Sequence, residues 1–228
     1  MSNSLRDKVV VVTGASSGIG RSIALESASR GATVILMARH QDKLEEIANE
    51  ARQLSGNEVY VFPTDISKAD QIDRAFNEIV SHVDHIDYLV NVAGFGVFKE
   101  FLETSPQVVT EMFQTNVLGL MYFTRLVARV MIDQKQGQII NFGSIAGIVP
   151  TTKTAAYSAT KAAIIQFSNV LRLELKPFGV KVMTVNPGPV YTNFFNIADE
   201  SGSYVNNVQR FMLDPDDVAW QVVHFVVN

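Results

Sequence analysis

Two residues four positions apart could form an acid/base pair. Tyr157 and Lys161 fall within a predicted helix over residues 155–178, where this spacing puts both side chains on one face. A free tyrosine ionises near pH ~10, and a nearby ammonium favours the phenolate and lowers that pKa. Such a tyrosine can give a proton to an oxygen that gains negative charge, and can take it back in the reverse reaction. The spacing therefore predicts Tyr157 as a proton donor and acceptor whose pKa is lowered by Lys161.

A glycine-rich segment, residues 13–20, lies between a predicted strand and a predicted helix. Gly14 allows a tight turn, Gly18 lets the backbone approach a pyrophosphate, and Gly20 allows close packing of helix and strand. The helix N-terminus adds free N–H groups and a partial positive charge. The loop is completed by Ser16, Ser17 and Ile19. This arrangement predicts a site for the phosphates of a dinucleotide.

The elements that position these residues alternate along the whole chain. Short Val/Ile-rich runs predict strands over residues 9–13, 33–38, 59–63, 88–91, 138–143 and 181–186. Amphipathic patterns predict helices over residues 18–30, 41–54, 68–82, 106–134, 155–178 and 215–227. Strict alternation predicts an α/β fold, a Rossmann-type doubly wound parallel sheet with helices on both faces. We expect residues 1–228 to form a single dinucleotide-binding and catalytic domain.

Two segments fit neither pattern, residues 93–104 and residues 188–213. Both follow the carboxyl end of a predicted strand, where open α/β sheets place their ligands. They carry the aromatic residues Phe95, Phe98, Tyr191, Phe194 and Phe195. We therefore expect residues 188–213 to be a substrate loop, and the substrate to be a small, apolar molecule.

The spacing of the glycine loop, G-x-x-x-G-x-G, extends into a wider resemblance. From Lys8 to the last helix, the sequence resembles the classical short-chain dehydrogenases/reductases. The motifs that carry the resemblance are residues 13–20, Asp65-Ile66, Asn91-Val92-Ala93-Gly94, Asn116, Ser144, Tyr157-x-x-x-Lys161 and Pro187-Gly188. The resemblance implies an oxidoreductase that interconverts a carbonyl and a secondary alcohol by hydride transfer, with Tyr157 as the acid/base.

The chain departs from the family pattern at two places. Val92 stands where the family has a second asparagine, and we expect only a small change in packing. The family also adds a seventh strand after the last helix, whereas this sequence stops within that helix. We expect either a six-stranded sheet or a shortened chain.

The resemblance also implies individual roles. Ser144 would polarise the substrate oxygen, and Asn116 would hold a water that links Lys161 to solvent. Lys161 would also bond the nicotinamide ribose, Asp65 would accept from the adenine amino group, and Val190 and Thr192 would meet the carboxamide. The remaining cofactor contacts would be Ile66, Asn91, Ala93, Gly94, Tyr157, Pro187 and Gly188.

The end of the second predicted strand indicates which nicotinamide cofactor binds. NAD-preferring relatives have an acidic residue there that holds the ribose 2′-hydroxyl. This chain has Ala38 at that position, followed by Arg39. A guanidinium binds a phosphate through paired, charge-assisted hydrogen bonds, and Ser16 could add a hydroxyl. The pair predicts NADP(H).

Composition excludes several other classes of function. The chain has 228 residues, a net charge of −4 and no cysteine. Thiolate chemistry and disulfides are thereby excluded, and the lack of a basic run argues against nucleic acid. No signal peptide or membrane-length apolar stretch occurs, so we expect a soluble cytoplasmic protein that does not bind membranes. The cluster of His82, Asp84, His85 and Asp87 lacks the fixed spacing of a helical zinc motif, so we expect no metal site.

Two alternative functions remain open. Lys135 and Arg172 flank the longest helices and could meet an acidic carrier protein, as in a 3-oxoacyl-[acyl-carrier-protein] reductase. The chain could also be a non-catalytic NADP-sensing interaction protein. In either case, the predicted helices over residues 106–134 and 155–178 are apolar on more than one face, which predicts a homodimer or homotetramer.

Overall fold

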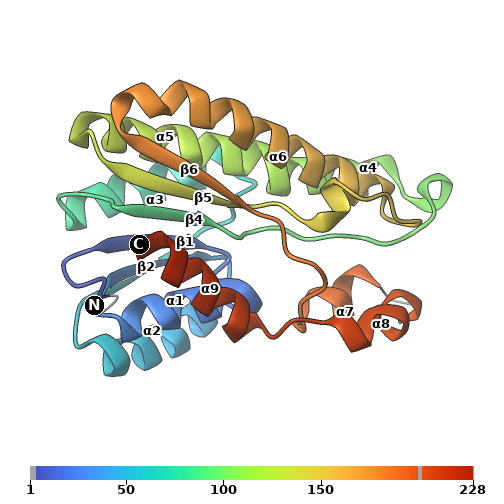
Figure 1. Ribbon diagram of the computed structural model, residues 1–228, viewed down its shortest axis with the longest axis horizontal. Helices are drawn as coiled ribbons and strands as arrows, with labels where there is room; N and C mark the ends of the chain where they lie inside the picture. Colours follow the sequence, from blue (N-terminus) through green and yellow to red (C-terminus); the bar gives the residue numbers. More distant parts are fainter. Residues whose placement is uncertain (1–3, 200–201, 228) are drawn as a thin grey trace.

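Six parallel strands form the centre of the structure, a computed structural model that describes residues 4–199 and 202–227 (Figure 1). Their order across the sheet is β3-β2-β1-β4-β5-β6, and each neighbouring pair is parallel. The strands are β1 (Val9–Thr13), β2 (Thr33–Ala38), β3 (Val59–Pro63), β4 (Tyr88–Asn91), β5 (Gly137–Phe142) and β6 (Val180–Val185). The predicted Rossmann-type fold is confirmed. The four N-terminal strands match their predicted bounds, and the last two begin and end one residue earlier.

Helices cover both faces of the sheet, because alternate residues of each strand point to opposite sides. Val10 and Val12 of β1 pack with α1 (Gly18–Ser29), α2 (Gln41–Ser55) and α9 (Pro215–Val227). Val9 and Val11 pack with α3 (Ala69–His82) and α5 (Leu120–Gln134). The long helix α6 (Ala155–Leu175) lies beside β6 and α5 (Figure 1). Both faces are therefore buried, which explains why the strands are almost wholly apolar.

The predicted helix over residues 106–134 is divided into three parts. Helix α4 (Pro106–Phe113) begins at Ser105, whose hydroxyl accepts a hydrogen bond from the N–H of Val108 at 3.3 Å. A π-helical segment, Gln114–Gly119, follows it and leads into α5. A β-carbon at Gly119 would lie 2.1 Å from the carbonyl oxygen of Ile66, so only glycine permits this close packing. Such segments widen a helix locally and often occur at functional sites.

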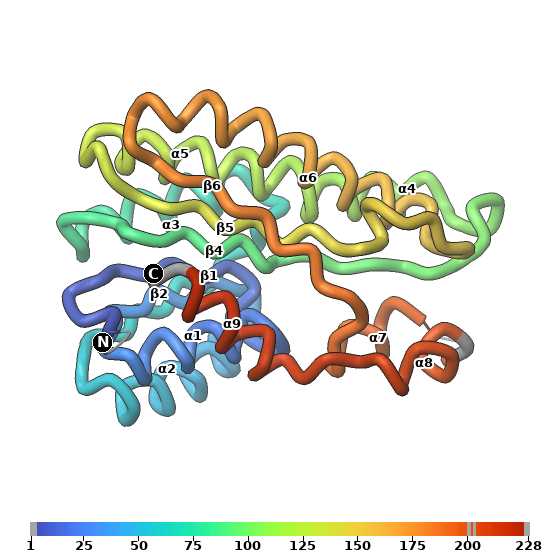
Figure 2. Tube along the Cα trace, viewed as in Figure 1, coloured from blue at the N-terminus to red at the C-terminus, as the bar shows by residue number. Residues whose placement is uncertain are grey.

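The predicted loop over residues 188–213 contains short helices. They are α7 (Phe194–Ala198) and α8 (Ser203–Val208). The chain leaves β6, passes through these helices beyond the carboxyl ends of the strands, and returns to α9 beside α1 (Figure 2). The N–H of Phe98 donates to the carbonyl of Ala198 at 2.7 Å. The two segments that sequence patterns left unassigned therefore contact each other.

None of the helices in the described ranges has the length and hydropathy that a membrane span requires.

Candidate active site

A cavity lies at the carboxyl ends of the strands, between the glycine-rich loop and residues 188–213. Most of the predicted site residues line it, and they come from every predicted motif. They are Gly14, Ser16, Ser17, Gly18, Ile19, Arg39, Asp65, Ile66, Ala93, Gly94, Ser144, Tyr157, Lys161, Pro187, Gly188, Val190 and Thr192. Gly20, Asn91 and Asn116 are the predicted site residues that do not line the cavity.

The glycine-rich loop forms one end of the cavity. Gly14 and Gly18 have φ angles of 70° and 51°, a backbone conformation that favours glycine. Ser17 precedes α1 without a side-chain capping bond, so the N–H groups of the first helical turn have no side-chain partner from it. A β-carbon at Gly20 would lie 2.3 Å from the carbonyl oxygen of Gly14. Gly20 does not line the cavity, but it allows the close packing of α1 against the glycine-rich loop that was predicted.

The end of β2 lies at the same end of the cavity. Ala38 and Arg39 both line it, and Arg39 is exposed. Within the described ranges, the Arg39 guanidinium has no ion pair or hydrogen bond with another side chain. Asp65 lines the cavity and also holds the turn before α3, because its Oδ1 accepts from the N–H and hydroxyl of Ser67 at 3.0 and 2.7 Å. Both residues therefore lie where a bound dinucleotide could reach them.

The side chain of Asn91 does not line the cavity, and its expected cofactor contact stays a prediction. Its side chain is buried and its Nδ2 donates to Thr124 Oγ1 and Asn141 Oδ1, both at 2.9 Å. Both N–H groups of the amide are used in a network that joins β4, β5 and α5. Its neighbour Val92 lines the cavity instead, and the N–H groups of Val92 and Ala93 donate to Thr13 Oγ1.

Asn116 does not line the cavity, but it holds a segment that does. Its buried side chain lies in the π-helical segment, where Oδ1 accepts from the N–H of Phe95 at 3.0 Å. Its Nδ2 donates to the carbonyl of Phe95 at 2.8 Å and to Thr160 Oγ1 at 3.1 Å. The amide therefore fixes residues 93–104 against α6. The water that Asn116 is expected to hold stays a prediction.

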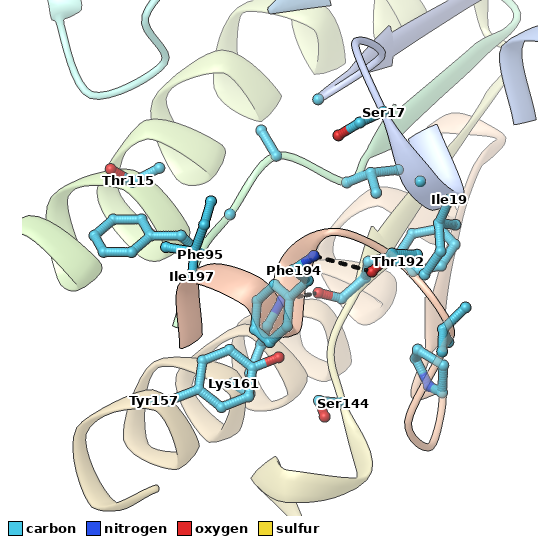
Figure 3. A pocket seen from close by; sticks show the side chains of 18 of the residues that line it. Ser17, Ile19, Phe95, Thr115, Ser144, Tyr157, Lys161, Thr192, Phe194 and Ile197 are labelled. Carbon is cyan, nitrogen blue, oxygen red and sulfur yellow. Dashed lines mark hydrogen bonds between the residues drawn. The ribbon is translucent and has the colours of Figure 1, made fainter. Parts of the chain in front are cut away.

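Tyr157 and Lys161 lie together in the cavity, as the spacing predicted (Figure 3). The Lys161 ammonium is 5.8 Å from the centroid of the Tyr157 ring and donates to the carbonyl of Phe142 at 2.8 Å. Burial lowers the pKa of Lys161 to about 8. Burial also raises the pKa of Tyr157 to about 12, although a hydrogen bond with Ser144 lowers it in part. The pKa of Tyr157 is therefore raised and not lowered as expected, because desolvation by burial is the largest effect on it.

Five aromatic rings enclose the far end of the cavity. They belong to Phe98, Tyr157, Phe194, Phe195 and Tyr204. The predicted aromatic set included three of these, whereas Tyr191 is 70% exposed and stands apart. Tyr204 was not predicted, although its place in the same loop as Phe194 and Phe195 is a usable signal.

The cluster that begins at His82 and ends at Asp87 lies away from the cavity and makes structural contacts. The buried Asp87 accepts from the Lys8 ammonium and from the N–H of Val9, both at 2.9 Å, and pairs with His85. His82 packs against the rings of Tyr60 and Phe62. Within the described ranges, no group of acidic, histidine or cysteine side chains could hold a metal ion.

Comparison with known proteins gives one consistent result. Residues 8–201 match the family model of the short chain dehydrogenases. The chain is 34% identical to an uncharacterized oxidoreductase of Staphylococcus aureus over 220 residues, which are 96% of this chain and 91% of the relative. It is similar to an alcohol dehydrogenase from Thermococcus sibiricus complexed with 5-hydroxy-NADP, with a TM-score of 0.87, 30% identity and coverage of 96% and 90%. It is also similar to L-sorbose reductase from Gluconobacter frateurii complexed with NADPH and L-sorbose, with a TM-score of 0.89, 27% identity and coverage of 99% and 92%.

The buried ammonium predicts how stability depends on pH. Its pKa is about 8 in the folded chain against an ordinary value of 10.5, so the unfolded chain binds more protons between these values. Stability should therefore rise with pH across that window, and the full cost of burial applies below it. We expect Lys161→Met to raise the free energy of unfolding at pH 7 by about 1–3 kcal/mol, and the gain to shrink toward pH 10.

Chemical denaturation at both pH values, with no cofactor added, measures this difference. Lys43→Met, which replaces an exposed lysine of α2, is the matched control and should change little at either pH. A Lys161→Met protein no more stable than the native one at pH 7 would contradict the prediction.

Proposed function

This chain belongs to the short-chain dehydrogenase family, and on that premise we propose that it is an NADP(H)-dependent oxidoreductase interconverting a carbonyl and a secondary alcohol. One observation carries the proposal. Tyr157, Lys161 and Ser144 line the same cavity as the glycine-rich loop and Arg39. A proton donor, its charged partner and a dinucleotide-binding loop thus share one space, as hydride transfer to a carbonyl requires.

The residues at the cavity fit NADP(H). The glycine-rich loop and the first turn of α1 would hold the pyrophosphate, and the unpaired Arg39 guanidinium would hold the 2′-phosphate. Asp65 would accept from the adenine amino group. The nicotinamide half would lie against Gly94, Pro187, Gly188, Val190 and Thr192. When bound, the nicotinamide supplies or accepts the hydride.

Residues of the chain would supply the proton that the substrate oxygen needs. With a pKa of about 12, Tyr157 carries its proton at neutral pH and can donate it to the substrate oxygen as that oxygen becomes an alkoxide. Ser144 shares a hydrogen bond with Tyr157 and would polarise the same oxygen. The phenolate that results lies beside the Lys161 ammonium, which stabilises it. Carbonyl reduction is therefore the direction that this tyrosine favours at neutral pH.

The alternative functions have weaker support. A carrier-protein surface would use Arg172, which is exposed but already donates from Nε to the carbonyl of Val182 at 2.8 Å and from Nη1 to Asn169 at 3.1 Å. A protein that only senses NADP would not need Ser144, Tyr157 and Lys161 together in the cavity. We therefore favour the enzyme.

The role of Tyr157 predicts a specific loss. Tyr157→Phe removes only the hydroxyl, so turnover should fall by at least about 100-fold, the usual scale for a lost acid/base. NADPH affinity should stay within about twofold, because the ring and Lys161 remain. NADPH oxidation with a panel of carbonyl compounds measures turnover, and calorimetry measures binding. Tyr191→Phe, at an exposed tyrosine in the segment that follows β6, is the control. Near-normal turnover by Tyr157→Phe would refute the assignment.

The choice of cofactor rests on Arg39. A lost charged hydrogen-bond pair costs about 1.5–3 kcal/mol, so Arg39→Ala should weaken NADPH binding about tenfold to a hundredfold. NADH affinity should hardly change, and Ala38→Asp should shift the preference toward NADH. Calorimetric Kd values for both cofactors test this, with Arg74→Ala, an exposed arginine of α3, as the control. Equal native affinity for NADH and NADPH, or an equal loss of both in Arg39→Ala, would show that Arg39 does not select the cofactor.

We also propose that the chain associates through the outer side of α5 and α6, as a homodimer or homotetramer. Leu118 of the π-helical segment before α5 is exposed, as are Val170 and Leu173 of α6, and Leu173 is 72% exposed. Light scattering at micromolar concentration should give two or four times the 25.1 kDa chain mass. Leu173→Glu should lower that mass, while Leu54→Glu, at an equally apolar exposed site on α2, should not. A native protein with the mass of a single chain would contradict the proposal.

A further inference from the structure

The far end of the cavity offers few charged side chains to a substrate. Among the described residues that line the cavity, the charged or titratable cationic and acidic side chains are Arg39, His40, Asp65 and Lys161. The first three belong to the end that faces the adenosine half of a dinucleotide, and Lys161 lies beneath Tyr157. The described lining residues between 145 and 154 and between 193 and 204 carry no charge. A carboxylate or phosphate on the substrate would find no partner among them.

Three polar side-chain atoms at this end already have partners within the chain. The hydroxyl of Thr154 donates to the carbonyl of Thr151 at 2.7 Å. The hydroxyl of Thr192 accepts from the N–H of Phe194 at 3.3 Å, and the carbonyl oxygen of the Asn193 side chain accepts from Asn196 at 3.4 Å. A substrate hydroxyl group that binds to one of these three atoms competes with its existing bond.

Aromatic rings form part of the remaining wall, together with aliphatic side chains such as Val149 and Ile197. The Phe98 ring lies at the centre of the group, with centroids 5.6 Å from Tyr157, 6.1 Å from Phe194, 6.1 Å from Phe195 and 5.0 Å from Tyr204. Phe195 and Tyr204 stack at 5.6 Å with an interplanar angle of 21°. These distances and tilts are those at which aromatic pairs attract each other beyond simple burial.

The Phe194 ring occupies the space directly beside Tyr157. Their centroids are 5.5 Å apart, and Figure 3 shows the Phe194 ring over Tyr157, on the side of Thr192 and the glycine-rich loop. Gly96 makes this contact possible, since a β-carbon there would lie 2.9 Å from both Phe194 Cζ and Tyr157 Cδ2. Tyr157 would protonate the oxygen of a substrate carbonyl, so a substituent on that carbonyl carbon must lie in the space that the Phe194 ring occupies. The structure therefore already shows a flat six-membered ring fitting there.

From this geometry we propose the substrate class: neutral ketones with an aromatic ring attached to the carbonyl carbon, whose ring takes the place of the Phe194 side chain. The inference rests on the proposed function. The Phe194 ring would move aside with α7, a helix of five residues, and the substrate ring would pack against Phe98. Hydride adds to the carbonyl carbon and the Tyr157 proton to its oxygen, which gives a benzylic alcohol.

A matched pair of ketones tests the shape of the site. Acetophenone and cyclohexyl methyl ketone have the same carbon skeleton, but only the first has a flat ring. We expect kcat/KM with NADPH to be about three- to tenfold higher for acetophenone, the scale of one or two aromatic contacts. L-sorbose, a polyhydroxylated ketone, should be turned over at least about 100-fold more slowly. Equal or better turnover of the cyclohexyl ketone or of L-sorbose would overturn the inference.

Two variants separate the roles of the rings. Phe98→Leu keeps an apolar side chain but removes the ring, so it should reduce the preference for acetophenone to less than about twofold. Phe194→Ala removes the competing ring, so it should lower KM for acetophenone about threefold or more. Phe211→Leu, an exposed phenylalanine of the same segment, is the control and should change neither value. A preference that survives Phe98→Leu, or a raised KM in Phe194→Ala, would contradict the assignment.

A binding measurement separates failure of this inference from failure of the proposed function. If no carbonyl compound supports NADPH oxidation, the proposed function is wrong. Ligand-observed NMR then still measures whether the protein with NADP(H) binds acetophenone more tightly than cyclohexyl methyl ketone, and whether Phe98→Leu removes the difference. Equal binding of the two ketones overturns the substrate class whatever the turnover.

Discussion

Burial of the Lys161 ammonium is the constraint on which the candidate site depends. The ammonium donates to the carbonyl of Phe142 at the end of β5, and close packing of α6 on the sheet removes water from around it. A β-carbon at Gly147 would lie 2.8 Å from the backbone of Lys161 and Ala162, so glycine is required for that packing. The same dehydration acts on Tyr157. It favours the neutral form of both side chains, which lowers one pKa and raises the other.

Buried polar side chains then fix the backbone around this pair. Thr13 at the end of β1 accepts from two consecutive N–H groups after β4, and Asn116 holds both polar groups of the Phe95 backbone. Asn91 connects β4 to β5 and α5 in the same layer. Irregular backbone is costly to bury unless its N–H and C=O groups are paired. These three side chains supply the partners, so one wall of the cavity is held rigidly against the sheet and α6.

Sequence reasoning succeeded where a local pattern decides the structure. Val/Ile runs located all six strands, and the i, i+4 spacing brought Tyr157 and Lys161 together. It failed where distant residues decide. The π-helical segment depends on the close contact between Gly119 and the Ile66 carbonyl. The orientation of the Asn91 side chain depends on its hydrogen bonds with Thr124 and Asn141. No local sequence pattern contains these contacts. The sign of the Tyr157 pKa shift depends on its burial by several segments, whereas the nearby ammonium could be read from the sequence.

The two ends of the cavity come from different parts of the chain. The end that would bind the substrate also buries Tyr157, so the same residues affect the choice of substrate and the pKa of the tyrosine. The glycine-rich loop and β2 form the polar end, while residues 93–104 and 188–213 form the aromatic end. Phe194 belongs to the aromatic end, yet its ring covers Tyr157 and contributes to the burial that raises the tyrosine pKa. Any change that opens this wall to water therefore also makes Tyr157 easier to ionise. A substrate that replaces the Phe194 ring with a ring of its own keeps the tyrosine dry and protonated. An apolar, flat substituent thus suits both the shape of the site and the chemistry of its acid.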